Sequence, residues 1–96
     1  MSEENQHKIG DILKGILGEQ QIVEKYQLTV IKSNWENWMG KAIESRTKDI
    51  RLYGNHLVIE VYSAALRQEL AYNKEQIIKI VNTGLEMDVI ESVQIR

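Results

Sequence analysis

The spacing of apolar residues changes twice along this chain of 96 residues, and the two changes divide it into helical and strand segments. Up to residue 42, apolar side chains recur every three or four residues, as they do on one face of a helix. Over residues 48–62 they alternate with polar ones, which is typical of strands with one buried face. Helical spacing returns over residues 64–83, and residues 89–96 are rich in β-branched side chains. The predicted order is therefore helix, helix, strand, strand, helix, strand.

Two helices are predicted before the strands. The apolar face of the first helix, which Gly18 should end, consists of Ile9, Ile12, Leu13, Ile16 and Leu17. The apolar face of the second consists of Leu28, Ile31, Trp35, Trp38, Met39 and Ala42. A capping box at Ser33 would restart the second helix, but its apolar face keeps its phase there. We therefore expect one nearly continuous helix, weakened or bent near Gly40.

Gly54 and Asn55 separate the two alternating segments and favour a hairpin turn. Ser63 can cap the next helix, and Gly84 suits its C-terminal end. Helices covering one face of the resulting three-stranded sheet would give a two-layer α+β domain. If the last two strands are neighbours, the helix between them forms a right-handed parallel crossover. We expect one domain over residues 9–96, preceded by a flexible tail over residues 1–8.

Composition excludes several classes of function. No cysteine is present, so disulfides, thiol nucleophiles and zinc-ribbon or iron–sulfur sites are excluded. No apolar run reaches the roughly 20 residues of a membrane span, and the N-terminus lacks signal-peptide character, so we expect a soluble cytoplasmic protein that does not contact membranes. The net charge is −2, which argues against a surface that is basic all over. Residues 32–53, however, carry five cations against three anions.

Catalytic and metal-binding patterns are also missing from the sequence. The only histidines are His7, near the start, and His56, beside the predicted hairpin turn. Such separated histidines favour neither a metal site nor a catalytic triad, and no nucleotide-binding glycine loop occurs. We therefore expect a protein that is not an enzyme and that uses no cofactor or metal.

Some residues could serve a binding function. Gly15 and Gly18 match the Gly-x-x-Gly of KH domains, but the two residues between them complete the apolar helix face, which favours helix core. Trp35 and Trp38 could stack on bases or anchor a partner, although core packing explains Trp35 more simply. The sheet face opposite the apolar one would present to solvent Arg51, Tyr53, Val58 and Tyr62, with Glu60 among them.

The chain resembles the DciA family. The resemblance covers residues 9–96 and rests on Trp35 and Gly40, Thr47, the hairpin segment 57–61, residues 63–70 (Ser-Ala-Ala-Leu-Arg-Gln-Glu-Leu), Asn82, and residues 89–96. It implies a KH-like α+β domain that binds the bacterial replicative helicase and assists its loading on DNA. Many relatives have tryptophan where this chain has Leu66, and longer relatives add a basic extension after the domain. These departures favour binding to a protein over tight binding to DNA.

The sequence and the resemblance together indicate a non-enzymatic adaptor in DNA replication. The candidate phosphate contacts are Arg46, Lys48, Arg51 and Arg67. The candidate partner or stacking residues are Tyr53, Tyr62 and Trp38. Arg67 could instead pair with Glu60 or cap the sheet edge. Two alternatives remain open, a general RNA-binding KH-like module without a helicase role and a homodimer formed through an exposed strand edge.

Overall fold

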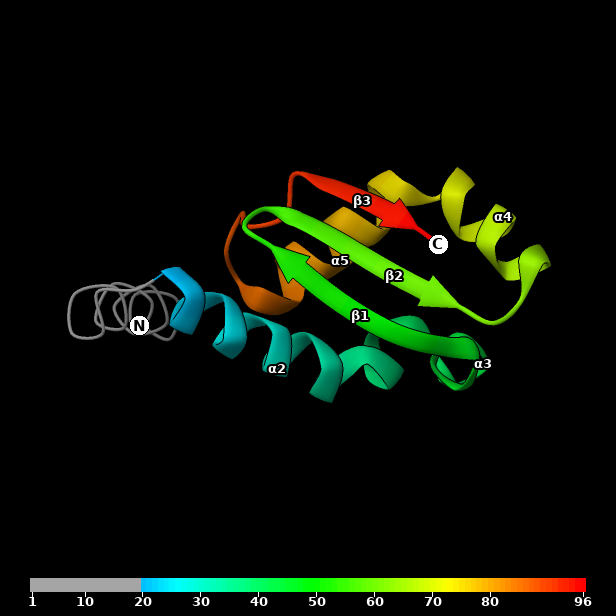
Figure 1. The fold of residues 1–96 in the computed structure, drawn as a ribbon, viewed down its shortest axis with the longest axis horizontal. Helices are drawn as coiled ribbons and strands as arrows, with labels where there is room; N and C mark the ends of the chain where they lie inside the picture. The colour runs from blue at the N-terminus through cyan, green and yellow to red at the C-terminus, as the bar shows by residue number, and fades with distance from the viewer. Residues whose placement is uncertain (1–19) are drawn as a thin grey trace.

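A three-stranded sheet with helices on one face makes up the part of the chain, residues 20–96, that the computed structural model describes (Figure 1). Its elements are α2 (Gln20–Met39), α3 (Lys41–Arg46), β1 (Thr47–Tyr53), β2 (His56–Val61), α4 (Ala64–Tyr72), α5 (Lys74–Leu85) and β3 (Ser92–Ile95). This confirms the predicted two-layer α+β class. The predicted helix over residues 9–17, the Gly15–Gly18 motif and the tail over residues 1–8 lie outside the described residues.

The sheet order is β1-β2-β3. Strands β1 and β2 are antiparallel and joined by the predicted turn, in which Gly54 adopts the left-handed φ of 64°. Strands β2 and β3 are parallel, in a register that runs from His56 opposite Ser92 to Ile59 opposite Ile95. The predicted parallel crossover is therefore confirmed, and α4 and α5 lie within it.

The hydrophobic core lies between the inner sheet face and the helices. Its strand residues are Ile50, Leu52, Leu57, Ile59, Val61 and Val93, and its helix residues are Ile31, Trp35, Leu66, Leu70, Ile77 and Val81. Trp35 is one of the largest fully buried side chains, as expected. Its indole Nε1 donates a hydrogen bond of 3.0 Å to Thr47 Oγ1, and that hydroxyl donates one of 2.7 Å to the carbonyl of Ile43. These two bonds connect α2, β1 and α3.

The structure corrects the end of the second predicted helix. The helix runs unbroken past Ser33, as expected, but it ends at Met39 instead of continuing to Ala42. Gly40 has a φ of 93°, which other residues rarely adopt, and the short helix α3 begins after it. Ala42 consequently lies on α3 and is exposed.

The helix predicted over residues 64–83 is also two helices. The side chain of Ser63 caps α4 as expected, accepting a hydrogen bond of 3.2 Å from the amide of Leu66. Asn73 then interrupts the helix, and its Nδ2 donates a hydrogen bond of 2.8 Å to the carbonyl of Glu69. Gly84 does not end α5. The left-handed residue at its end is Glu86, with a φ of 57°.

Strand β3 is shorter than the predicted strand over residues 89–96. Residues 86–91 form a loop that Asn82 fastens to α5, because its Oδ1 accepts hydrogen bonds from the amides of Val89 (3.1 Å) and Ile90 (2.8 Å). The Nδ2 of Asn82 donates a further bond of 3.0 Å to the carbonyl of Ile90. The β-branched residues before Ser92 therefore contact a helix side chain instead of a neighbouring strand.

Candidate interaction surface

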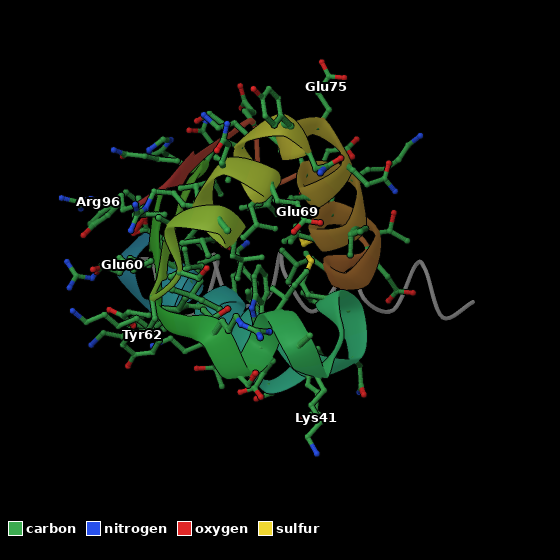
Figure 2. The ribbon with its side chains drawn as sticks, turned by 90° about the vertical axis from the view of Figure 1, so that its right-hand side faces the viewer. Lys41, Glu60, Tyr62, Glu69, Glu75 and Arg96 are labelled. Atoms are coloured by element: carbon green, nitrogen blue, oxygen red, sulfur yellow. The ribbon has the colours of Figure 1, made fainter. Side chains whose placement is uncertain are left out.

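The sheet face opposite the helices carries several of the predicted binding residues. Tyr53, at the end of β1, is 56% exposed, and Tyr62, directly after β2, is 69% exposed. Figure 2 shows this face at its left side, where Glu60, Tyr62 and Arg96 point away from the helices. Two aromatic side chains are therefore available to a partner without any rearrangement of the core.

Val58 corrects the expectation for this face, because it is only 3% exposed. It lies on the central strand, between Arg51 on β1 and Gln94 on β3. The long side chains of its two neighbours can cover a valine at such a position. Val58 is therefore part of the buried structure and offers little surface to a partner.

Arg51 lies on the open face as predicted, but two carboxylates accompany it. Its Nε is 3.0 Å from Asp49 Oδ2, and its Nη2 is 3.7 Å from Glu60 Oε1. The hydrogen bond from Arg51 is the main cause that lowers the pKa of Asp49, and the same bond raises the pKa of Arg51. A phosphate would have to displace these carboxylates, so Arg51 is the least available of the four predicted phosphate contacts.

Three distant chain segments meet at the end of the sheet where β2 terminates. The amide of Tyr62 donates a hydrogen bond of 2.9 Å to the carbonyl of Arg46, and the amide of Val61 donates one of 2.9 Å to the carbonyl of Arg96. The first turn of α4 follows at once, with an amide bond of 2.9 Å from Arg67 to the carbonyl of Ser63. Arg46 and Arg96 therefore lie at the strand end that leads into the exposed Tyr62, and Arg67 follows in the first turns of α4.

These arginines form no ion pair with any carboxylate of residues 20–96. Arg46 donates a hydrogen bond of 3.2 Å from Nη1 to the carbonyl of Ala42, which leaves most of its guanidinium donors unused. The alternative pairing of Arg67 with Glu60 is not present, because Glu60 contacts Arg51 instead. We refer to Arg46, Tyr62, Arg67 and Arg96 as the basic end of the sheet.

Lys48 lies near the basic end, at the start of β1, but it lines a separate recess. It is the extra residue of a β-bulge between Thr47 and Asp49, and it lines a recess of about 240 Å³ together with Lys32 and Glu44. Lys32 is 3.7 Å from Asp49 Oδ1. The bulge turns Lys48 out of the strand alternation, and its side chain is exposed.

Trp38 is separated from the other predicted partner residues. It is half-buried on α2, packs against the core, and lines a mainly apolar groove of about 350 Å³ with Ile80 and Gly84 of α5. The structure therefore brings Arg46 and Tyr62 together, with Arg67 five residues further along the chain on α4. It leaves Tyr53 at the opposite end of the same face and places Trp38 on the helical layer.

Arg96 was missing from the candidate residues. The alternation of Ser92, Gln94 and Arg96 with buried Val93 was visible in the sequence and places Arg96 on the open face. What the sequence did not provide was the parallel register with β2, which brings Arg96 beside the strand end that precedes Tyr62.

Membrane-spanning helices and metal-binding clusters are both absent from the part of the chain that the structure describes. Within residues 20–96, no helix is both long and apolar enough to cross a membrane. In the same part of the chain, no three histidine, aspartate or glutamate side chains gather as a metal site would require.

Comparison with known proteins gives one clear result. The model of the DciA family, described as the DnaC/DnaI antecedent, matches residues 8–95. No curated protein sequence matches the chain significantly. No solved structure matches it significantly either. Because the family model spans nearly the entire sequence, the chain belongs to the DciA family, whose members are non-enzymatic factors in loading the bacterial replicative helicase.

Proposed function

We propose that this chain binds the replicative helicase through the open sheet face and the basic end, and that the basic end also contacts single-stranded DNA weakly. The observation that carries the proposal is the family match over residues 8–95, which implies the helicase DnaB as partner. A role in bacterial replication also supports a cytoplasmic location. The surface described above supplies the residues for both contacts.

Tyr62 is the centre of the proposed protein contact. It is the more exposed of the two tyrosines on this face, and its amide is held by a hydrogen bond to the carbonyl of Arg46. Tyrosine and arginine are enriched among the residues that dominate binding energy at protein interfaces. Tyr53 extends the contact along β1, and Trp38 offers a separate apolar contact in the groove beside α5.

Arg46 and Arg67 are the proposed phosphate contacts, with Lys48 beside them. Their charges are not paired with carboxylates of residues 20–96, so a phosphate would not need to break an existing ion pair. Arg51 contributes less because it donates a hydrogen bond to Asp49 and forms an ion pair with Glu60, so both carboxylates compete with a phosphate. With so few free cations, we expect weak, salt-sensitive binding to single strands.

A titration of the full chain against its host's replicative helicase tests the proposal. Fluorescent single-stranded DNA and RNA are titrated in parallel at low and moderate salt. We expect saturable helicase binding that persists at moderate salt and is weakened at least tenfold by Tyr62→Ala, as for a hot-spot residue. Tyr72→Ala is the matched control, because Tyr72 is 81% exposed but lies at the far end of α4.

The other functions predict different results. Tight binding to RNA with no helicase binding would replace the proposal with an RNA-binding module. A mass that rises with concentration, with neither helicase nor nucleic-acid binding, would indicate a homodimer. Equal effects of Tyr62→Ala and Tyr72→Ala would move the helicase contact away from the open face.

A further inference from the structure

A recess lies at the end of the molecule opposite the basic end. There the beginning of α2 meets the β1–β2 hairpin and the loop between α5 and β3 (Figure 1). Its volume is about 380 Å³. The residues that line it are Val23, Gln27, Gly54, Asn55, Met87, Asp88 and Val89.

Gln27 is the unusual residue of this recess. It is only 6% exposed, it is the one polar residue buried among residues 22–96, and its Oε1 accepts no hydrogen bond. A buried acceptor without a donor lowers the stability of a protein, whereas a leucine or methionine of similar size would carry no such cost. A ligand that supplies a donor would therefore gain an interaction for which the protein alone has no partner.

The surroundings of the recess are acidic. Asp88 lies at its rim, and the Glu24 carboxylate accepts a hydrogen bond from the Gly54 amide at its wall. Nearby, Asn55 Nδ2 donates a bond of 2.8 Å to Glu91 Oε2. Among residues 22–96, no lysine or arginine lines the recess. A cationic donor would fit this environment, and an anion would be repelled.

We propose that this recess binds an arginine side chain of a partner protein. The planar guanidinium has five donors and can bond the Gln27 amide oxygen and the Asp88 carboxylate at the same time, which a compact lysine ammonium does less well. Its methylene stem can lie along the apolar walls formed by Val23, Met87 and Val89. The terminal amide torsion of glutamine is soft, so Oε1 can turn into the recess when the guanidinium enters.

The partner is the one named under the proposed function, so the source of the arginine rests on that proposal. The recess and the basic end lie at opposite ends of the strands, because Gly54 joins the strand ends far from Arg46 and Tyr62. The helicase would then contact the domain at two places of opposite charge. Such a double contact fixes the orientation of the domain on its partner.

The site itself is tested without the helicase. Amide NMR spectra of the full chain are recorded with N-acetylarginine amide added. N-acetylcitrulline amide, which is neutral and has the same shape, is the control. We expect shifts at Val23, Gln27, Gly54 and Val89 with arginine only, and their loss in Asp88→Asn, an exposed change that leaves the core intact. Equal shifts with both compounds, or none, would overturn the proposal.

Helicase-binding measurements on recess variants test whether the helicase supplies the arginine. Gln27→Leu removes the unpaired acceptor, so we expect its Tm to rise by about 4–8 °C while helicase affinity falls about tenfold or more. Asp88→Asn should weaken the same affinity, and the control Tyr72→Ala, at the far end of α4, should not. Helicase affinity unchanged in both recess variants would overturn the proposed source. No helicase binding by the unaltered chain, with arginine-specific shifts present, would instead refute the proposed function and leave the recess as a site.

Discussion

The indole of Trp38 packs directly on the backbone of Gly84, so that a Cβ placed on Gly84 would lie only 2.2 Å from Trp38 Cζ2. This contact joins the C-terminal turns of α2 and α5, the two longest helices of the described chain. Gly84 has ordinary helical geometry, and its place in α5 is explained by this close approach instead of by a turn.

Gly84→Ala should therefore destabilise the fold although alanine is the better helix former. The methyl group would force the indole away, and overpacking of this kind costs about 1–3 kcal/mol. Urea unfolding followed by circular dichroism measures the change. In a Trp38→Leu background the clash is relieved, and Gly84→Ala should then stabilise by up to about 1 kcal/mol. The same sign in both backgrounds would refute the steric explanation.

Asn82 makes the next prediction, since its side chain forms three hydrogen bonds to the loop before β3. Asn82→Ala removes three hydrogen bonds and leaves the amides of Val89 and Ile90 without acceptors, so we expect a loss of about 2–3 kcal/mol. Asn82→Asp retains the acceptor and should lose less. Hydrogen exchange at Val89 and Ile90 reports on the loop directly. Slow exchange at both amides in Asn82→Ala would contradict this role.

Because Asp49 and Arg51 form an ion pair, we expect part of the free energy of unfolding to be lost in acid. The pKa of Asp49 in the folded protein lies below the ordinary aspartate value of 3.8, mainly because Arg51 donates a hydrogen bond to it. The stabilisation is therefore complete above pH 4–5 and is lost as pH falls through the folded pKa. Because the pair is on the surface, where solvent screens it, its contribution to stability should be small.

Unfolding free energies at pH 7 and pH 3 test this expectation. Asp49→Asn should lower stability at pH 7, and this difference should shrink as pH falls through the lowered pKa of Asp49. In the acid range, the free energy of unfolding of the Asp49→Asn protein should also fall less steeply with pH than that of the unaltered chain. An identical pH dependence in both proteins would mean that other carboxylates account for acid sensitivity.

Arg67 and Arg51 should differ in their effects on single-stranded DNA. Removing one phosphate contact reduces the salt slope by about 0.7, which corresponds to an affinity loss of roughly three- to fivefold near 0.1 M salt. We expect this loss for Arg67→Gln. Arg51→Gln should cost less than about twofold, because the neighbouring carboxylates of Asp49 and Glu60 already offset its charge. Fluorescence anisotropy at several salt concentrations measures both, and the reverse ranking would place the DNA on the open face instead of the basic end.

Most of the fold followed from the period of the apolar residues, because the same faces of α2, β1 and β2 that alternate in the sequence face the core. The break at Asn73 did not follow. Leu70 and Ile77 remain seven residues apart on one face whether or not the helix is interrupted between them, so the period carries no sign of the break. Only the side-chain bond from Asn73 to Glu69, which competes with the helix, marks it.

The candidate surface was predicted less completely than the fold. Alternation correctly placed Arg51 and Tyr53 on one face, but it could not show that Asp49 and Glu60 surround Arg51, or that Val58 is covered by its neighbours. Those facts depend on cross-strand register, which a bulge at Lys48 alters. Gln27 was also missed, because a glutamine on an amphipathic helix is ordinarily a solvated residue.

The parallel pairing of β2 with β3 has a consequence for how the chain folds. His56 and its partner Ser92 are separated by 36 residues, whereas the β1–β2 hairpin closes over two. Closing the longer loop costs more chain entropy, so β3 should join the sheet after the hairpin has formed. Until then β2 has an unpaired edge that carries Leu57 and Ile59, and a second unfinished chain could pair with it. The interval between hairpin formation and the arrival of β3 is therefore the period in which this small domain is most exposed to aggregation.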